Sequence, residues 1–326
     1  MITMPQFTVL QPENVSQAVD FLAKHENLRV LAGGSDLVVN LRNRLFTPEY
    51  VLDIKGIKDL HGIKETNAGL SIGALTTLTE VSKNAFVKEN YPVLAMAAHV
   101  VAGPNIRNMG TIGGNICLDT RCYWYNQSLF WRKSCNFCLK KDGDICHVAP
   151  GGKYCWAAYS GDTAPALLSL GASVRILSPK GERTVELKDF FVMDGIKKYN
   201  LDSNEIITEV LIPKVSAGYQ GVYKKLRIRE SVDYPLAGVA VTGRVDKEGV
   251  CQAVSVALTA VNPAPVLVSE ITDLLVGKRL TDELVETSVE LARKTAKPMK
   301  TTLSTMPYRR HMIGVFVKQG LMEVLK

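Results

Sequence analysis

The sequence predicts an α+β protein of two domains, and two patterns of apolar residues carry this prediction. In roughly the first sixty residues, short apolar strands alternate with amphipathic helices, which predicts a β-turn-helix-β unit. From about residue 218 onward, three segments of alternating polarity are followed by two helical segments. The length of 326 residues accommodates two domains, or one large domain with subdivisions.

Local signals then place the elements along the chain. Strands are predicted where short apolar or alternating runs occur, at 7–10, 29–31, 50–54, 70–72, 173–177, 205–212, 222–229, 237–244 and 252–259. Helices are predicted where apolar residues recur at helical spacing, after a cap at Asn14 or Ser16, after residue 36 through Arg44, and at 77–84, 92–101, 162–172, 281–296 and 307–325. The segment 117–155 is predicted to be mostly loop, which is uncommon in a compact domain unless something organises it.

Composition and charge narrow the function classes. The net charge of +7 is spread along the chain without a basic tract or a DNA-binding motif, so no nucleic-acid partner is expected. The N-terminus has no signal-peptide pattern, and the longest apolar runs, such as 254–261, are too short to span a membrane. We therefore expect a cytoplasmic protein with no membrane association.

Two glycine-rich segments are candidates for contact with a nucleotide cofactor. The first, 31–36, reads Leu-Ala-Gly-Gly-Ser-Asp, and the second, 107–116, reads Arg-Asn-Met-Gly-Thr-Ile-Gly-Gly-Asn-Ile. Glycines let a backbone approach a phosphate closely, but Gly-Gly-Ser is equally typical of an ordinary helix start, and the second segment could be a tight turn in a sheet. Neither is the G-x-G-x-x-G fingerprint that follows a long strand, which disfavours a Rossmann fold.

Six of the seven cysteines lie between Cys117 and Cys155, and only Cys251 lies elsewhere. In a reducing compartment, clustered thiols favour a metal site over disulfides. Zinc could take four cysteines, or three with His147, but zinc sites usually use two close pairs, and only Cys135 and Cys138 form one. A cubane iron–sulfur cluster also needs four thiolates, and beside a nucleotide cofactor it has an evident redox use. Iron–sulfur is therefore favoured over zinc.

The two glycine-rich segments, taken together, resemble the FAD-binding subunits of the molybdenum hydroxylases, the family of xanthine dehydrogenase and carbon monoxide dehydrogenase. The segment 160–168, Ser-Gly-Asp-Thr-Ala-Pro-Ala-Leu-Leu, is similar to that family's Ser-Asp-x-x-Pro-Ala-Leu, and 223–229 resembles the strand that opens its C-terminal domain. The resemblance covers nearly the whole chain in the right order.

The resemblance implies a two-part FAD-binding domain followed by a small α+β domain of three strands and two helices. We expect the FAD domain at 1–215, with subdomains at about 1–56 and 57–215 and an iron–sulfur loop inserted at about 117–157. The C-terminal domain is expected at 218–326, after a linker near 213–218.

The resemblance also implies contacts to FAD, with Val101 near the flavin or adenine, Asp162 as a hydrogen-bond partner, and Lys224, chosen over Lys225, reaching in from the C-terminal domain. The residues that it places at the cofactor are Arg29, Val30, Leu31, Ala32, Gly33, Gly34, Ser35, Asp36, Val101, Gly110, Thr111, Gly113, Gly114, Asn115, Asp162 and Lys224. No catalytic residue is expected on this chain.

The cysteine segment departs from most of that family and resembles one branch, the flavin subunit of 4-hydroxybenzoyl-CoA reductase, which carries an additional 4Fe–4S cluster. That branch implies four ligands, Cys122, Cys138, Cys146 and Cys155. Cys117 would be a packed core thiol, and Cys135 is the first reserve as a ligand. The aromatic residues of the loop are expected to cover the cluster and exclude water, namely Tyr123, Trp124, Tyr125, Phe130 and Trp131.

The resemblance implies an electron-transfer subunit that works with a molybdopterin-binding large subunit and a 2Fe–2S small subunit, as a dimer of heterotrimers. Electrons would pass from a low-potential donor such as ferredoxin through 4Fe–4S and FAD toward molybdenum, for reductive dehydroxylation of 4-hydroxybenzoyl-CoA to benzoyl-CoA. One alternative is an oxidative molybdenum hydroxylase in which FAD passes electrons to NAD or a quinone. Another is a zinc-braced scaffold with no redox role.

Overall fold

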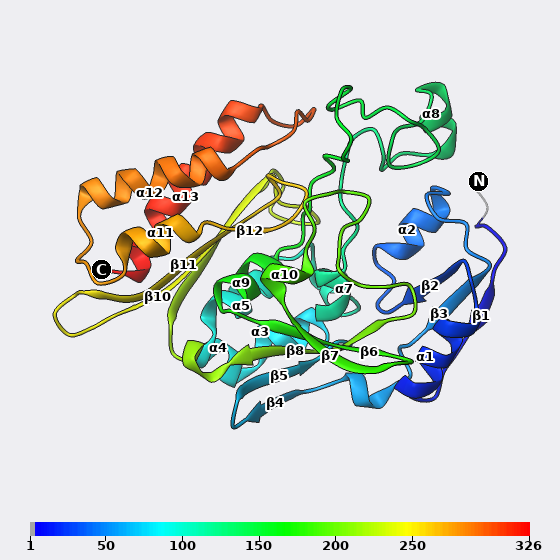
Figure 1. Ribbon diagram of the computed structural model, residues 1–326, viewed down its shortest axis with the longest axis horizontal. Coiled ribbons are helices and arrows are strands. Elements are labelled where there is room, and N and C mark those ends of the chain that lie inside the picture. The colour runs from blue at the N-terminus through cyan, green and yellow to red at the C-terminus, as the bar shows by residue number, and fades with distance from the viewer. Residues whose placement is uncertain (1–3) are drawn as a thin grey trace.

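The computed structural model describes residues 4–326, which form three β-sheets with helices packed between and around them (Figure 1). The first sheet is parallel, in the order β1-β3-β2. Its elements are β1 (Thr8–Leu10), α1 (Val15–Lys24), β2 (Leu28–Leu31), α2 (Leu37–Arg42) and β3 (Tyr50–Asp53).

Helix α1 shows why this first unit forms as the sequence predicts. The side chain of Asn14 caps the helix by accepting a hydrogen bond from the Gln17 backbone N–H at 2.9 Å. Ala18, Val19 and Leu22 recur on one face and are buried in a shared core with Leu52 of β3. The unit therefore holds the ends of its strands in fixed positions beside the segment 32–36.

The second sheet has five strands in the order β4-β5-β8-β6-β7, with every neighbouring pair antiparallel. Its strands are β4 (Ile63–Thr66), β5 (Gly69–Gly73), β6 (Ser173–Ser178), β7 (Gly181–Glu186) and β8 (Ile206–Pro213). The helices of this region are η1 (Lys58–Leu60), α3 (Leu78–Lys83), α4 (Ala85–Asn90), α5 (Pro92–His99), α6 (Pro104–Arg107), α7 (Ile112–Ile116), α9 (Thr163–Ser169), α10 (Leu187–Phe190) and η2 (Lys214–Ser216).

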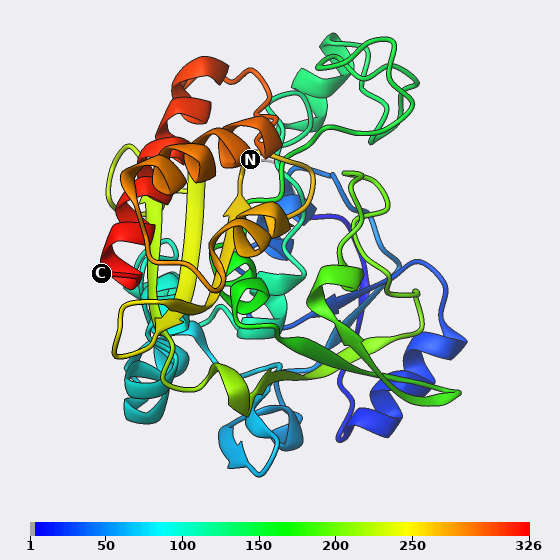
Figure 2. The ribbon, with the colours of Figure 1, turned by 60° about the vertical axis from the view of Figure 1, so that its left-hand side comes forward.

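The segment between α7 and α9 forms a lobe that projects from the body in both ribbon views (Figures 1 and 2). It contains one short helix, α8 (Leu129–Ser134), and otherwise turns and loops, as the sequence predicts. At its base Arg121 and Ala158 exchange two backbone hydrogen bonds, of 2.7 and 2.8 Å. The buried Arg132 fixes the lobe to the end of α2 by donating to the Asn43 and Arg44 carbonyls at 3.2 and 2.9 Å.

The third sheet, near the C-terminus, is antiparallel in the order β12-β11-β10-β9. Its elements are β9 (Gln220–Leu226), β10 (Ala237–Val245), β11 (Cys251–Thr259), β12 (Val266–Leu267), α11 (Ser269–Leu275), α12 (Asp282–Thr295) and α13 (Met306–Val324). The sequence predicts three strands and two helices here, whereas the structure adds β12 and α11. These two short elements follow the segment 262–265, Asn-Pro-Ala-Pro, whose prolines hide the pattern on which the prediction depends.

The alternation of side chains along the third sheet joins it to the rest of the molecule. Val239 and Val241 of β10 pack into a core with α13, which covers one face of the sheet (Figure 2). Ala240 and Tyr223 point the other way and join the large core that includes α5 and α9. The FAD-domain helices and the C-terminal sheet thus share buried side chains.

Candidate functional site

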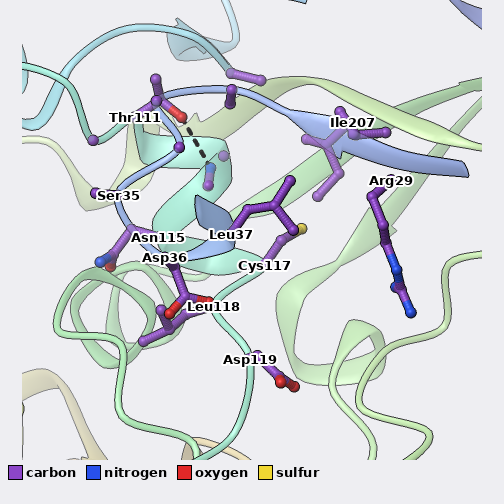
Figure 3. A pocket seen from close by; sticks show the side chains of 18 of the residues that line it. Arg29, Ser35, Asp36, Leu37, Thr111, Asn115, Cys117, Leu118, Asp119 and Ile207 are labelled. Atoms are coloured by element: carbon purple, nitrogen blue, oxygen red, sulfur yellow. Dashed lines mark hydrogen bonds between the residues drawn. The ribbon is translucent and has the colours of Figure 1, made fainter. Parts of the chain in front are cut away.

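A cavity of about 510 Å³ lies where the first sheet, the two glycine-rich segments and the base of the lobe meet. Figure 3 shows its lining side chains, which come from segments around Ser35, Thr111, Asn115 and Asp119. The volume falls in the range of cofactor pockets. All of the residues expected at the cofactor line this cavity, except Leu31 and Lys224.

The first glycine-rich segment owes its shape to two glycines. A Cβ added at Gly33 would lie 1.8 Å from the carbonyl oxygen of Met109, which shows that the two glycine-rich segments touch here. Gly34 has a φ of +73°, in the left-handed region that glycine adopts without strain. The two segments, far apart in sequence, therefore form one continuous wall of the cavity.

The second glycine-rich segment is held by side-chain hydrogen bonds. The Thr111 hydroxyl caps α7 by accepting from the Gly114 backbone N–H at 3.1 Å, the bond drawn in Figure 3. The Asn115 side-chain oxygen accepts from the Thr163 N–H at 3.1 Å and from the Thr163 hydroxyl at 2.7 Å. These bonds tie the loop to the start of α9, which brings Asp162 to the cavity.

Asp162 is buried and is paired with a cation from the C-terminal sheet. Its carboxylate accepts from Lys225 Nζ at 3.0 Å and from the Tyr223 hydroxyl at 2.8 Å. Burial raises the pKa of Asp162, while the charge of Lys225 and the hydrogen bonds oppose that rise. Lys225 Nζ also donates to the Val100 carbonyl, at 3.0 Å. One lysine therefore fixes Asp162 and the backbone next to Val101, both of which line the cavity.

Lys224 does not lie where the sequence analysis placed it. Its Nζ pairs with Glu323 of α13, at 2.5 Å, on the outer side of the sheet. Successive side chains of a strand point to opposite faces, so only one member of the pair 224–225 can face the FAD domain. Lys225 is that residue, and the sequence signal of two adjacent lysines could not distinguish them.

The four cysteines expected to be ligands line one small cavity in the lobe. Cys122, Cys138, Cys146 and Cys155 come from separate parts of the lobe and surround this space together with Trp124, Tyr125, Lys140 and His147. Burial raises the pKa of the Cys122 and Cys155 thiols to about 12 and about 11. Such thiols ionise only where a cation compensates the charge.

The other two cysteines of the segment lie elsewhere. Cys135 follows the last turn of α8, is half-buried, and does not line the cysteine cavity. Cys117 lines the larger cavity, and burial raises the pKa of its thiol to about 12. Within residues 4–326, no three His, Cys, Asp or Glu side chains converge closely enough to hold a single metal ion.

The aromatic residues of the lobe divide between covering the cysteine cavity and facing solvent. Trp124 and Tyr125 line the cavity, and the ring of His147 packs against Trp124 with centroids 4.6 Å apart. His147 Nε2 also donates a hydrogen bond to the Phe137 carbonyl, at 2.5 Å. Phe130, expected to be part of the cover, is instead 85% exposed, because the first turn of α8 points it outward.

Asp119 and two lysines, none of them singled out by the sequence analysis, connect the two cavities. Asp119 lines the larger cavity and accepts from Lys198 Nζ at 2.6 Å and Lys140 Nζ at 2.9 Å. Burial alone would raise the pKa of Asp119, but the two lysines lower it well below its usual range. These residues come from distant segments, so no local pattern in the sequence reveals their association.

Asp36, Arg121 and Tyr234 form a second connection across the larger cavity. Arg121 donates to both the Asp36 carboxylate and the Tyr234 hydroxyl, and its guanidinium lies 4.3 Å from the centre of the Tyr234 ring. Burial raises the pKa of Asp36, and the charge of Arg121 opposes it. The first glycine-rich segment, the base of the lobe and the C-terminal domain are thereby linked at one rim.

Known protein families match this chain in two parts, one N-terminal and one C-terminal. Residues 5–215 match the family described as the FAD binding domain in molybdopterin dehydrogenase. The chain belongs to this family of FAD-binding subunits. Residues 221–324 match the CO dehydrogenase flavoprotein C-terminal domain, so the chain is an oxidoreductase subunit of the CO, xanthine and nicotinate dehydrogenase type.

Relatives of this FAD subunit match it over almost their full length. The carbon monoxide dehydrogenase medium chain of Hydrogenophaga pseudoflava is 30% identical, over 97% of this chain and 96% of its own. The nicotinate dehydrogenase FAD-subunit of Eubacterium barkeri is 28% identical, over 97% and 95%. The solved structure of carbon monoxide dehydrogenase from Oligotropha carboxidovorans superimposes with a TM-score of 0.83 at 27% identity, over 99% of each chain. The expected mixed α and β fold is therefore confirmed.

No helix within residues 4–326 combines the length and apolar character that crossing a membrane requires.

Proposed function

We propose that the larger cavity holds FAD and that its two glycine-rich walls bind the pyrophosphate and ribityl chain. The observation that carries this proposal is the contact of Gly33 with Met109, which joins the two glycine-rich segments into one wall of the cavity. Such a surface exposes backbone N–H groups to negatively charged phosphate oxygens. Ser35 and Thr111 add hydroxyl groups on the same wall.

Other residues of the chain have supporting roles in this proposal. Val101, which lines the cavity, offers an apolar contact to a ring of the cofactor. Asp162 is a hydrogen-bond partner, and Lys225, in place of Lys224, holds its carboxylate in position. FAD, when bound, exchanges electrons one or two at a time between its partners. The protein binds and orients the cofactor, and no residue of this chain is proposed to act on a substrate.

We further propose that the lobe binds a 4Fe–4S cluster through Cys122, Cys138, Cys146 and Cys155. The support is that these four thiols, and neither Cys135 nor Cys117, surround one buried cavity. Four cysteine thiolates are the donor set of a cubane cluster. The cavity is only about 10 Å³ as the side chains stand, so the thiols would have to rotate outward to admit the cluster.

The zinc-braced scaffold is less well supported. Tetrahedral zinc with Zn–S bonds of about 2.3 Å requires sulfur atoms about 3.8 Å apart around one point. Within the described residues no three potential ligands converge in this way. A 4Fe–4S cluster is larger than a zinc ion and binds each cysteine sulfur at a different iron, which suits thiols that surround a cavity.

The chain would then be an electron-transfer subunit of a molybdenum enzyme. A molybdopterin-binding large subunit and a 2Fe–2S small subunit are the proposed partners, in a dimer of heterotrimers. The support is similarity over almost the full length to the medium chain of carbon monoxide dehydrogenase, whose solved relatives are described as molybdenum enzymes.

The direction of electron flow has two candidates, and the oxidative one is better supported. The relatives reported above are named as dehydrogenases, which favours electrons leaving through FAD toward NAD or a quinone. The lobe alone favours the reductive direction, in which a ferredoxin-like donor feeds the cluster and 4-hydroxybenzoyl-CoA is dehydroxylated. Iron–sulfur centres can reach potentials of roughly −700 mV, low enough for that chemistry.

Metal and flavin analysis of the anaerobically purified protein tests the proposal. We expect one FAD and about four iron and four sulfide per chain, with an EPR signal after reduction that Cys146→Ser abolishes. Zinc without iron would reject the cluster, and a colourless protein would reject the FAD site. Turnover of the whole complex with an oxidisable substrate, or with 4-hydroxybenzoyl-CoA and a reductant, then decides the direction.

A further inference from the structure

The boundary between the two cavities is charged and buried. Asp119 faces the FAD cavity (Figure 3), and its side chain is 5% exposed. Its carboxylate also accepts from the Tyr125 hydroxyl at 2.8 Å, and Tyr125 lines the cysteine cavity. Each oxygen of this carboxylate is therefore bound to groups of the lobe.

Two lysines share this carboxylate from different sides. Lys140 lines the cysteine cavity, is 7% exposed, and lies with its Nζ 4.0 Å from the centre of the Tyr125 ring. Its Nζ is fixed further by the Thr120 hydroxyl at 2.6 Å and the Thr120 carbonyl at 3.2 Å. Lys198 lines the FAD cavity and is 20% exposed. Of these two lysines, Lys140 lines the cavity of the four cysteines and Lys198 does not.

Asp119, Lys140 and Lys198 form a triad whose charges do not cancel. Two ammonium groups accompany one carboxylate, which leaves one net positive charge at a site largely shielded from water. One-electron reduction of an iron–sulfur cluster adds one negative charge to it. A cation held close by in a medium of low dielectric constant stabilises that added charge far more than it would in water. Hydrogen bonds and nearby charges are the means by which proteins shift cluster potentials.

We propose that Lys140, positioned by Asp119 and Thr120, raises the reduction potential of the lobe's cluster and so sets the driving force between the cluster and FAD. This role rests on the proposed cluster, and it assigns Lys140 a positioned charge that neither donates a ligand nor touches a substrate. Lys198 balances the same carboxylate from the FAD side and has a smaller effect on the cluster.

An EPR-monitored redox titration of the full chain, purified anaerobically in its complex, tests the proposal. Lys140→Met should make the cluster's midpoint potential more negative, lowering the reduced-to-oxidised ratio at the wild-type midpoint about tenfold, which is about 59 mV for one electron. Asp119→Asn removes the negative charge and should shift the midpoint in the positive direction. Lys140→Arg should stay near the wild type, and Lys198→Met should shift the cluster less than Lys140→Met.

The opposite signs separate an electrostatic role from a structural one, because a merely disturbed lobe would not move the potential both ways. A midpoint unchanged in Lys140→Met, or displaced in the same direction by Asp119→Asn, would overturn the proposal. If Lys140→Met does not retain iron, the comparison of Asp119→Asn with Lys140→Arg and the wild type decides the matter. Absence of iron from the wild-type protein would instead reject the cluster, and with it any role for Lys140 in tuning one.

Discussion

At position 33, the proposed FAD site requires a residue that has no Cβ atom. Its Cα lies so close to the Met109 carbonyl that an added Cβ would overlap it at 1.8 Å. The carbonyl is backbone, so a substitution can be accommodated only by separating the two glycine-rich segments. Such a separation would move apart the backbone groups that are proposed to contact the phosphates.

Gly33→Ala should therefore lower FAD affinity at least about tenfold, or about 1.4 kcal/mol, while the remainder of the chain stays folded. Gly56→Ala is the matched control, because a Cβ at Gly56 meets no atom within 4 Å. The ratio of flavin to protein after gel filtration, with circular dichroism as a folding check, measures the effect. Full flavin content in Gly33→Ala would show that the wall is not the binding surface.

The neighbours Lys224 and Lys225 illustrate how one step along a strand changes a residue's role. Lys225→Met would leave Asp162 buried without its cation, which typically costs about 3–5 kcal/mol. Lys224→Met removes a half-exposed pair with Glu323 and should cost less than about 1 kcal/mol. Urea unfolding of the two variants measures both values. Equal destabilisation by the two substitutions would contradict the assignment of Lys225.

At the scale of single elements, the two ends of the lobe lie side by side where it joins the body of the protein. The paired backbone bonds between Arg121 and Ala158 bring its two ends together, so a short turn can replace what lies between them. Most of the larger cavity is built from residues outside the lobe. FAD binding and metal binding should therefore be separable.

A variant in which a short glycine-containing turn replaces residues 122–157 should fold and retain FAD but contain no iron. Absorbance spectra and iron analysis of the purified variant measure the two cofactors independently. The variant should also be less stable than the wild type, because the bonds from Arg132 to the end of α2 are lost. A variant that folds but loses FAD would show that the lobe is part of the flavin site.

An ion pair between Arg183 of β7 and Glu205, just before β8, predicts that the stability of the protein depends on pH. Arg183 binds Glu205 through two bonds, of 2.8 and 2.6 Å, and these lower the pKa of Glu205 in the folded state. A lowered folded-state pKa gives stability that is complete above the unfolded pKa of about 4.3 and is lost as the pH falls through the folded value.

The wild type should therefore be more stable than Glu205→Gln near pH 6, and the difference should shrink as the pH falls below about 4.3. Chemical unfolding of both proteins across this range measures it. A difference that does not depend on pH would mean that the carboxylate charge contributes nothing to stability.

Local sequence predicted elements with a strong apolar periodicity and missed short ones, among them the helices α4 and α8, although Asn84 and Ser128 cap them. Helix α1 has both a cap at Asn14 and an apolar face, and it forms where expected. Strand β12 is two residues long between proline-containing and helical segments, so its pairing depends on β11, a partner that no local window contains. The same reason explains which parts of the candidate site the sequence could predict. The glycine segments carry their own signal, whereas the triad around Asp119 exists only once three distant segments are packed together.

At the scale of the whole molecule, the two proposed cofactor sites meet at the base of one lobe. The FAD cavity is lined mostly by residues within 5–215, the part that matches the FAD-binding family, and also by Tyr234 of the C-terminal domain. The lobe contains a second cavity, surrounded by four thiols. The shared boundary contains Asp119, Lys140 and Lys198, so charge at one site is felt at the other. This proximity is what an added electron-transfer centre requires, in either direction of flow.

The proposal that four particular thiols bind a 4Fe–4S cluster distinguishes sharply between Cys135 and Cys138. These cysteines are three residues apart, yet only Cys138 lines the cavity. EPR spectra of the reduced proteins, with iron counted per FAD, should show the cluster signal and about four iron in Cys135→Ser, and neither in Cys138→Ser. Loss of the cluster in Cys135→Ser with its retention in Cys138→Ser would contradict the account.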